Sequence, residues 1–472
     1  MPWTPSLPSE DAPIYLRIAR AVVADVRDGR LRPGDRLPGA RTLAAQLGVH
    51  RHTVDAAMRE LRAQGWLESQ PRSGVRVAVS LPVVPFATTS PAPLRRPLPD
   101  RPAPRMPRLT PPARLTLEGG RPDLRLLPIH ELTAAWRRAL RGGGRRLLDY
   151  GDPQGHRALR EVLGAWLRDR RGLKLEPEGL LITRGAQQAL FLTAMACFSP
   201  GDRVAVEALG YAPCWEAFRA VGVHLVPIPV DPHGIDVDAL ARADVQGVYL
   251  TPHHQYPTMV PLSPARRQAL LQLAYDRRML IVEDDYDHEL HYAGSPRLPL
   301  AHADPHGLIV YVGTLSKALA PGLRVGFLCA HPEVIRRMTA LRVAIDRQGD
   351  AVTERAVAEV IGLGILDRHI RHMQRVYADR AALTHALATD ALRLPVPRPD
   401  GGLSLWAPSP VDPARLRQAC EARGVSFRIG ADHTFDGADA PFLRLGFSNL
   451  HEAELREAFS VIHDEVRRLG GG

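Results

Sequence analysis

The chain has 472 residues, enough for two or three domains, and its hydrophobic content of 45% is that of a globular protein. No apolar run approaches the roughly 20 residues of a membrane-spanning helix, and the start lacks a signal-peptide pattern, so we expect a cytoplasmic protein without membrane contact. The net charge is +10, and residues 1–112, with 17 Arg against 9 Asp and Glu, carry +8 of it, which favours contact between this part and a polyanion.

Residues 10–79 combine helical patterns with short turns. The expected helices cover Ile14 to Val26, a short segment that ends at Gly48, and a segment from about His50 to Gly65. A β-hairpin then follows, from Trp66 to Ala78, with its turn at Ser73 and Gly74. This order of elements is typical of a winged helix-turn-helix, a double-stranded DNA-binding domain.

In such a domain the start of the third helix enters the major groove. The residues that we expect to face base edges and phosphates there are His50, Arg51, His52 and Thr53. Arg41, at the head of the second helix, and Arg72, in the wing, are expected to contact the DNA backbone. The alternative is a small helical cap on an enzyme, whose arginines serve only solubility.

Several short motifs of this segment resemble the DNA-binding domain of GntR-type regulators. They are Arg36-Leu37-Pro38, Arg41-Thr42-Leu43-Ala44, Leu47-Gly48-Val49, Arg51-His52-Thr53-Val54 and Gly65-Trp66-Leu67. Three residues depart from the family pattern. Gly39-Ala40 replaces the usual Ser-Ser before Arg41, and His50 replaces the usual Ser at the start of the recognition helix. These departures affect individual DNA contacts, whereas the expected fold is unchanged.

Residues 80–112 are crowded with proline and arginine, which predicts an extended, semi-rigid linker. From residue 113 to 472, helical patterns alternate with short apolar runs, which predicts an α/β domain with a largely parallel sheet. The expected strands are Arg203–Val206, Gly247–Leu250, Leu280–Val282 and Leu308–Val312.

Lysine occurs only at Lys174 and Lys317, and every other basic side chain is arginine. A lysine amine can form a Schiff base with an aldehyde cofactor, which arginine cannot do. Lys317 stands in Gly313-Thr314-Leu315-Ser316-Lys317, directly after an expected strand, whereas Lys174 lies in a polar stretch and is expected to be exposed. Hydroxyls of Thr314 and Ser316, with the guanidinium of Arg324, could bind a phosphate beside that aldehyde.

Two further motifs fit the same chemistry. Asp284 and Tyr286 are two residues apart at a strand end, so that both can point to one side. A pyridinium nitrogen needs such a carboxylate, and a ring hydroxyl can accept from the phenol. Gly185, at the start of an expected helix, allows the backbone to approach a phosphate closely. By itself the acidic strand end would rather indicate a metal site or a solvated edge.

Residues 115–465 resemble the fold-type I pyridoxal-phosphate (PLP) enzymes, and with the GntR-like segment the whole chain resembles the MocR subgroup of GntR regulators. The motifs that carry this resemblance are Tyr150–Gly155, Thr251–Thr258 and Glu283–Asp287. The resemblance implies that Lys317 binds PLP covalently, with Asp284 at the ring nitrogen and Tyr286 and Gln255 near the ring hydroxyl. It implies that Tyr211 stacks on the ring and that Arg444 binds a substrate carboxylate, unless Arg444 is a surface strand residue. It also implies phosphate contacts from Gly185, Ala186, Gln187, Thr314 and Arg324, and from Tyr150 of the other subunit of a homodimer.

The remaining histidines and cysteines indicate no further binding site. The histidine pairs His253-His254, His288 with His291, and His369 with His372 lack a full ligand set at a recognised spacing, so no metal site is expected. The four cysteines are scattered and are expected in the core. Met259 stands where the family usually has glycine, and His253 where it commonly has serine.

The resemblance implies a transcription regulator that binds promoter DNA and senses PLP or an adduct of PLP with a small amino compound. Control of vitamin B6 synthesis is the favoured role. The alternative is a catalytically active PLP-dependent aminotransferase that carries a DNA-binding head. A third possibility, an effector domain that no longer binds cofactor, is disfavoured by the joint presence of Lys317, Asp284 and Tyr286.

Overall fold

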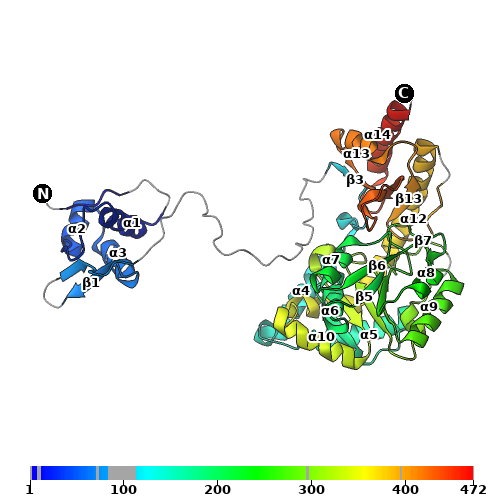
Figure 1. The fold of residues 1–472 in the computed structure, drawn as a ribbon, viewed down its shortest axis with the longest axis horizontal. Coiled ribbons are helices and arrows are strands. Elements are labelled where there is room, and N and C mark those ends of the chain that lie inside the picture. The colour runs from blue at the N-terminus through cyan, green and yellow to red at the C-terminus, as the bar shows by residue number, and fades with distance from the viewer. Residues whose placement is uncertain are drawn as a thin grey trace. The chain divides into compact units, whose positions relative to one another are not determined.

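The computed structural model describes residues 3–7, 12–70, 74–82, 113–293, 297–393 and 396–470. The chain divides into two compact units, Met1–Asp100 and Arg101–Gly472 (Figure 1). Most of the predicted linker, from residue 83 to residue 112, lies outside the described residues. No helix within the described ranges is both long and apolar enough to cross a membrane.

The N-terminal unit consists of α1 (Ile14–Arg27), α2 (Ala40–Leu47), α3 (Arg51–Ala63) and the antiparallel strands β1 (Leu67–Gln70) and β2 (Gly74–Val77). One core holds it together, because buried residues of the three helices and of β1 and β2 pack against one another. Gly48 ends α2 in the left-handed conformation, with φ of 65°, which glycine adopts without penalty. The winged helix-turn-helix prediction is confirmed, although the predicted turn at Ser73 lies outside the described residues.

A seven-stranded sheet forms the centre of the C-terminal unit, in the order β4-β12-β11-β10-β9-β5-β6. The strands are β4 (Leu180–Thr183), β5 (Arg203–Glu207), β6 (His224–Ile228), β9 (Gly247–Leu250), β10 (Leu280–Asp285), β11 (Ile309–Thr314) and β12 (Gly326–Cys329). Only β12 runs antiparallel to its neighbours, so the predicted, largely parallel sheet is confirmed.

Helices cover both faces of this sheet. Alternate strand residues, such as Val310 and Val312, pack against α6 (Ala186–Cys197), α7 (Ala212–Ala220) and α10 (Pro332–Ile345). Ile309 and other residues of the opposite face pack against α8 (Val237–Arg242) and α9 (Pro264–Arg277), beside β5 and β6 in Figure 1. Burial on both faces explains why these strands appear in the sequence as continuous apolar runs.

The remaining elements flank the sheet or form a smaller subdomain. The helices are α4 (Ile129–Gly143), α5 (Arg157–Arg171), α11 (Ala351–Gly362), α12 (Ile365–Leu392), α13 (Pro413–Ala422) and α14 (Glu452–Gly470). A second sheet has the order β13-β16-β15, with β13 (Ser404–Pro408), β15 (Arg428–Ile429) and β16 (Phe442–Gly446). Two short pairs complete the list, β7 (Val230–Asp231) with β8 (Gly234–Ile235) and β3 (Leu115–Thr116) with β14 (Val425–Ser426).

The pairing of β3 with β14 positions the segment that follows β3. Leu115 pairs with Val425, and the backbone N–H of Gly446 donates to the carbonyl oxygen of Leu117 at 2.7 Å. These contacts hold Gly119 and Gly120 beside β16, although β16 is far from them in the sequence.

Candidate functional site

The predicted cofactor residues come from several strands but from one edge of the sheet. Asp284 ends β10, Lys317 follows β11, and Gly185 follows β4, which runs in the same direction as β11. Because the carboxyl ends of parallel strands meet at one edge, the loops that follow them lie close together there. This is the usual position of a ligand site in an open α/β sheet.

Lys317 lies at this edge of the sheet and is mostly buried. Its Nζ donates a hydrogen bond to the carbonyl oxygen of Gly120 at 2.6 Å. Burial and then the positive charge of Arg444 lower the pKa of the Lys317 amine to about 8, against the opposing effect of Asp287 and Asp284. A substantial fraction of the amine is therefore neutral, and thus nucleophilic, near pH 8. The other lysine, Lys174, is exposed, as the sequence predicts.

Asp284 is buried at the end of β10 and has one hydrogen-bond partner that the sequence did not indicate. The hydroxyl of Tyr249, on the neighbouring strand β9, donates to Oδ2 at 2.8 Å. Oδ1 has no hydrogen-bond partner among the described residues. Burial raises the pKa of Asp284 to about 7, although the Tyr249 hydrogen bond and the charge of Lys317 oppose this shift. The unpartnered Oδ1 atom can accept a hydrogen bond from a protonated ring nitrogen, which is the role predicted for this residue.

The start of α6 offers an anion site. Gly185, with φ of 77°, precedes the first helical residue, Ala186, and the Nη2 atom of Arg324 donates to the carbonyl oxygen of Arg184 at 2.8 Å. A Cβ atom on Gly185 would stand 2.8 Å from Arg324 Nη2, so glycine is required for this approach. The first N–H groups of a helix lack intrahelical partners and attract phosphate. The guanidinium and the helix terminus therefore fit a phosphate group.

The hydroxyls predicted to support this phosphate are also together. Thr314 Oγ1 and Ser316 Oγ are 2.9 Å apart and buried, and the backbone N–H of Ser316 donates to Thr314 Oγ1 at 3.1 Å. Gln187, the second residue of α6, donates from its Nε2 atom to the carbonyl oxygen of Pro213 at 2.8 Å. Its buried Oε1 atom is unpartnered within the described ranges.

Tyr256 is the centre of an aromatic cluster, although the sequence indicated only its loop. Its ring centroid lies 5.6 Å from Tyr211, 6.0 Å from Tyr286 and 5.2 Å from His433, each in an edge-to-face arrangement. The guanidinium of Arg444 lies over the same ring, 4.6 Å from its centroid. Tyr256 therefore connects the residues predicted at the cofactor ring with the arginine predicted to bind a carboxylate.

Arg444 is buried on β16, so the interpretation as a surface strand arginine is wrong. Its Nη1 atom donates to the carbonyl oxygen of Glu118 at 2.6 Å, and its Nε atom has no partner in the part of the chain that the structure describes. A Cβ atom on Gly119 would stand 2.7 Å from Nη1. The glycine pair Gly119-Gly120 thus contacts both Arg444 and Lys317, which nothing in the local sequence signalled.

The side chain of Gln255 stabilises its own loop through hydrogen bonds. Its Nε2 atom donates to the carbonyl oxygens of Leu209 and Tyr256, both at 2.7 Å, and its Oε1 atom accepts from Thr258 Oγ1 at 2.6 Å. Tyr150 lies at the surface, 73% exposed, with the guanidinium of Arg347 over its ring. Such exposure fits a residue that would act in another subunit.

Met259 adopts φ of 67°, a conformation that costs a side-chain-bearing residue about 1 kcal/mol or more. This geometry explains why glycine is usual at this position in the family. The Met259 Sδ atom accepts from the Tyr286 hydroxyl at 3.7 Å, so the departure also changes what the phenol contacts.

In the N-terminal unit, Arg41, His50, Arg51 and His52 are exposed, and Thr53 is half-buried. The Arg51 guanidinium lies 3.5 Å from Asp55 one turn further along α3. Arg72, predicted in the wing, lies outside the described residues. All the described candidates are thus accessible to DNA at the start of α2 or α3.

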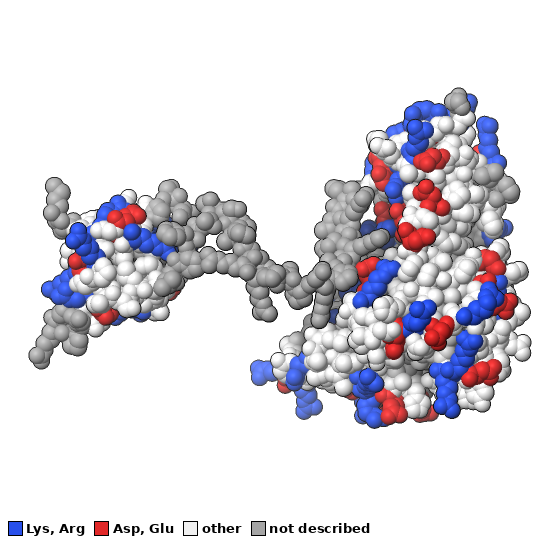
Figure 2. All heavy atoms as spheres, viewed as in Figure 1, with Lys and Arg blue, Asp and Glu red and all other residues white. Residues whose placement is uncertain are grey.

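The C-terminal unit has a much smaller excess of positive charge than residues 1–112. On the face in Figure 2, acidic and basic side chains are interspersed, in agreement with a surplus of only +2 over residues 113–472.

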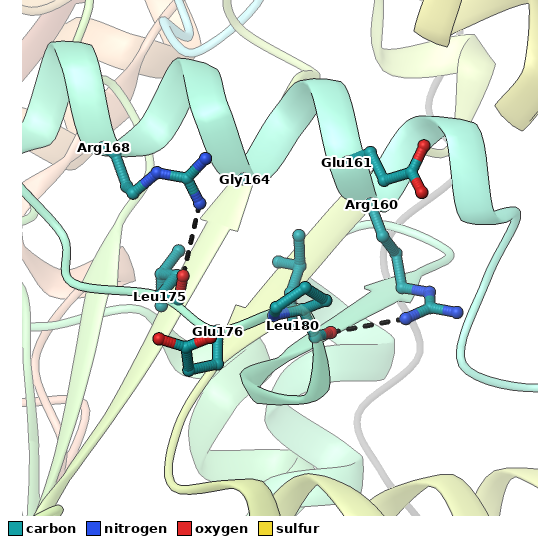
Figure 3. Close-up of a pocket in the computed structure, with 8 residues that line it drawn as sticks. Arg160, Glu161, Gly164, Arg168, Leu175, Glu176 and Leu180 are labelled. Carbon is teal, nitrogen blue, oxygen red and sulfur yellow. Dashed lines mark hydrogen bonds between the residues drawn. The ribbon is translucent and has the colours of Figure 1, made fainter.

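A surface pocket of about 150 Å³ lies apart from the predicted residues, none of which lines it (Figure 3). Two of its arginines already bind backbone oxygens, because Arg168 donates to Leu175 at 3.2 Å and Arg160 to Pro177 at 3.3 Å. We therefore assign this pocket no role. It is lined by Arg160, Glu161, Gly164, Arg168, Leu175, Glu176, Pro177 and Leu180.

Comparison with known proteins supports the assignment of both units. Residues 14–77 match the family of bacterial regulatory proteins called gntR, and residues 123–462 match aminotransferase class I and II. The chain is 29% identical to the probable rhizopine catabolism regulatory protein MocR of Rhizobium meliloti, over 97% of this chain and 95% of that protein. It is 30% identical to the pyridoxine biosynthesis transcriptional regulator PdxR of Corynebacterium glutamicum, over 97% of both chains. The crystal structure of a multiple substrate aminotransferase from Thermococcus profundus matches with a TM-score of 0.71 and 28% identity, over 77% of this chain and 93% of that one.

Proposed function

The chain belongs to the MocR subgroup of GntR-type regulators, in which a DNA-binding domain is joined to a class I and II aminotransferase domain, and on this basis we propose that it is a PLP-responsive transcription regulator. The N-terminal unit binds promoter DNA in the cytoplasm, and the C-terminal unit binds PLP. The observation that supports cofactor binding most directly is the mostly buried Lys317 amine, with a pKa lowered to about 8, near the unpartnered oxygen of Asp284.

The residues at the edge of the sheet fit the chemical groups of PLP. Lys317 would bond to the aldehyde carbon, Asp284 would accept the hydrogen bond of the ring nitrogen, and Arg324 with the start of α6 would bind the phosphate. Tyr211 would stack on the ring and Tyr286 would lie near its hydroxyl, and both tyrosines contact Tyr256 edge to face. When bound, PLP supplies a ring that withdraws electrons from an attached amine.

Regulation requires that a ligand favour one arrangement of the protein over another. We propose that PLP, or PLP joined to a small amino compound, provides this difference in a homodimer, to which Tyr150 contributes from the partner subunit. Arg444 would recognise a carboxylate on the amino compound. Among possible targets we favour genes of vitamin B6 synthesis, because one of the relatives is named for regulation of pyridoxine biosynthesis.

The first experiment is the visible absorption spectrum of the full-length protein, before and after borohydride. We expect a yellow band that borohydride removes, with PLP retained covalently on the chain. The variant Lys317→Ala should lack both, whereas Lys174→Ala, which alters the other, exposed lysine, should retain them. A colourless protein that takes up no added PLP would contradict cofactor binding.

The second experiment selects binding sites from random double-stranded DNA and measures affinity with and without PLP and amino compounds. A regulator should bind one sequence class specifically, and a ligand should change that affinity. The competing function is an active aminotransferase, which the buried guanidinium of Arg444 near Lys317 favours. Substantial turnover with amino donors, without a specific DNA sequence, would establish the enzyme and contradict the regulator.

A further inference from the structure

Two histidine pairs that are far apart in the sequence meet in the fold. His253 and His254 follow β9, and His288 and His291 follow β10, which is paired with β9 in a parallel register. One ring nitrogen of each of His253, His254 and His291 lies within 4.8 Å of the others. The ring centroid of His253 lies 4.5 Å from that of His254 and 6.4 Å from that of His291.

These imidazoles have nitrogen atoms without hydrogen bonds. Among the described residues, both ring nitrogens of His253, both of His291 and the Nε2 atom of His254 are buried and unpartnered. The backbone of Ala293 approaches the His291 ring, but without hydrogen-bond geometry. Buried polar atoms almost always have a partner, which can be protein, ordered water or an ion. Several unpartnered nitrogens so close together therefore indicate a site for a bound water or ion.

Asp287 orients His254 in the way that favours a metal ligand. Its Oδ1 atom lies 2.9 Å from Nδ1 of His254, which leaves Nε2 of the same ring available. A carboxylate bound to the far nitrogen is the usual second contact of a metal-binding histidine, because it fixes the tautomer and the ring orientation.

A second set of possible ligands, His253 with Asp285 and His288, is less suited to a metal. Asp285 is already committed, because its Oδ2 atom lies 2.7 Å from His288 Nδ1 and accepts from the Tyr311 hydroxyl at 2.7 Å. The guanidinium of Arg171 lies 3.9 Å from the same carboxylate. Oδ1 of Asp285 and Nε2 of His288 have no hydrogen-bond partner among the described residues, but a cation bound there would lie beside the positive charge of Arg171.

Of the three rings, that of His291 lies nearest the surface. It is only partly buried and lines an open pocket of roughly 600 Å³ together with Tyr292, Arg371 and Gln374. His253 and His254 do not line this pocket and are buried.

We propose that His253, His254 and His291 bind one divalent transition-metal ion, with Zn²⁺ as the fitting probe. Three imidazoles with one further tetrahedral position for water form a ligand set that Zn²⁺ accepts. The sequence predicted no metal because neither pair is a full ligand set, and only the pairing of β9 with β10 unites them.

The test uses full-length protein that is purified without a polyhistidine tag and dialysed against EDTA. Zn²⁺ is titrated in competition with a chromophoric chelator, and Co²⁺ is added separately, since tetrahedral Co²⁺ absorbs visible light strongly. We expect one Zn²⁺ per chain, a rise in the unfolding temperature, and Co²⁺ bands that Zn²⁺ abolishes. Absence of stoichiometric Zn²⁺ binding to the folded protein would overturn the proposal.

Variants distinguish the two possible ligand sets. His291→Ala, at the partly exposed position, and His253→Ser should each weaken Zn²⁺ binding at least about 100-fold, because each removes a direct ligand. His288→Ala should bind Zn²⁺ as the unaltered protein does, and so should His372→Ala, which alters an exposed histidine of α12. Loss of binding in His288→Ala with retention in His291→Ala would overturn the assignment. Circular dichroism of each variant establishes that it is folded.

Discussion

The hydroxyl of Tyr249 donates a hydrogen bond of 2.8 Å to Asp284, the carboxylate that we assign to the cofactor ring nitrogen. This bond opposes the rise in the Asp284 pKa that burial causes. The two residues occupy neighbouring parallel strands, so their side chains meet within the sheet.

Replacement of Tyr249 by Phe should therefore raise the pKa of Asp284 further above its ordinary value. At pH 7 less carboxylate would be present, and we expect PLP to bind roughly 10-fold more weakly, since a hydrogen bond to a charged group contributes about 1.5–3 kcal/mol. Equilibrium titration followed by absorbance measures this affinity. Tyr311→Phe is the control, because it removes an equivalent bond to Asp285. Equal weakening in both variants would indicate a general loss of packing.

A methyl group on Gly185 should block the phosphate site. In Gly185→Ala the new Cβ would stand 2.8 Å from Arg324 Nη2, and we expect PLP affinity to fall at least about 10-fold through loss of the charge-assisted phosphate contact. Gly201→Ala is the matched control, because Gly201 also has positive φ, at 94°, but its Cβ would meet nothing within 4 Å. Both variants should lose about 1–3 kcal/mol of stability from the strained backbone. If Gly201→Ala weakens PLP binding as much, strain alone accounts for the effect.

Cofactor uptake should depend on pH through Lys317. The neutral amine is the nucleophile, and the pKa of this amine is lowered from 10.5 to about 8. The rate constant for PLP uptake by cofactor-free protein should therefore rise with pH and level off above about pH 8. Stopped-flow absorbance from pH 6 to pH 11 measures the profile. A plateau reached only above pH 10 would show that the amine is not perturbed.

The same shift affects stability. Between pH 8 and pH 10.5 the unfolded chain keeps the Lys317 proton that the folded chain has released. The free energy of unfolding of the cofactor-free protein should therefore rise with pH in this window, relative to Lys317→Met, and the difference should be constant below it. Urea titrations of both proteins at several pH values test this sign.

Arg444 should determine the response to amino acids but not the binding of PLP itself. We expect Arg444→Met to retain PLP and to lose at least about 10-fold in affinity for α-amino carboxylates, because their charge loses a buried ionic partner. Amines without a carboxylate should bind as before. Arg428→Gln is the control, since Arg428 pairs opposite Arg444 in the sheet but is exposed. Spectral shifts on addition of each compound give the affinities.

In the DNA-binding unit, Arg41→Ala should weaken binding to all DNA sequences alike, as expected for a phosphate contact. The slope of log affinity against log salt concentration should fall by about 1. Arg51→Ala should instead reduce discrimination between sequences, because Arg51 lies at the start of α3. Arg30→Ala is the control, since the Arg30 guanidinium is already paired with Asp25 at 2.6 Å and Asp28 at 3.0 Å. An unchanged salt slope in Arg41→Ala would remove Arg41 from the interface.

The sequence by itself determined the elements and the reactive groups. Helical spacing and glycine stops located α1, α2 and α3, and continuous apolar runs located the strands that are buried on both faces. The rarity of lysine singled out Lys317, whose chemistry arginine cannot replace. These features are local, because residue type and spacing along a few turns or strand residues are enough to produce them.

The tertiary structure decided which distant residues meet. The Lys317 amine contacts Gly120 across 197 residues, Arg444 contacts Glu118 across 326, and Tyr249 contacts Asp284 across 35. None of these partners has a local signature. The histidines that follow β9 and β10 are a similar case, since neither pair by itself provides enough ligands for a metal ion. The physical reason is that parallel pairing aligns the carboxyl ends of strands at one edge, so the composition of the site depends on strand order and not on spacing in the sequence.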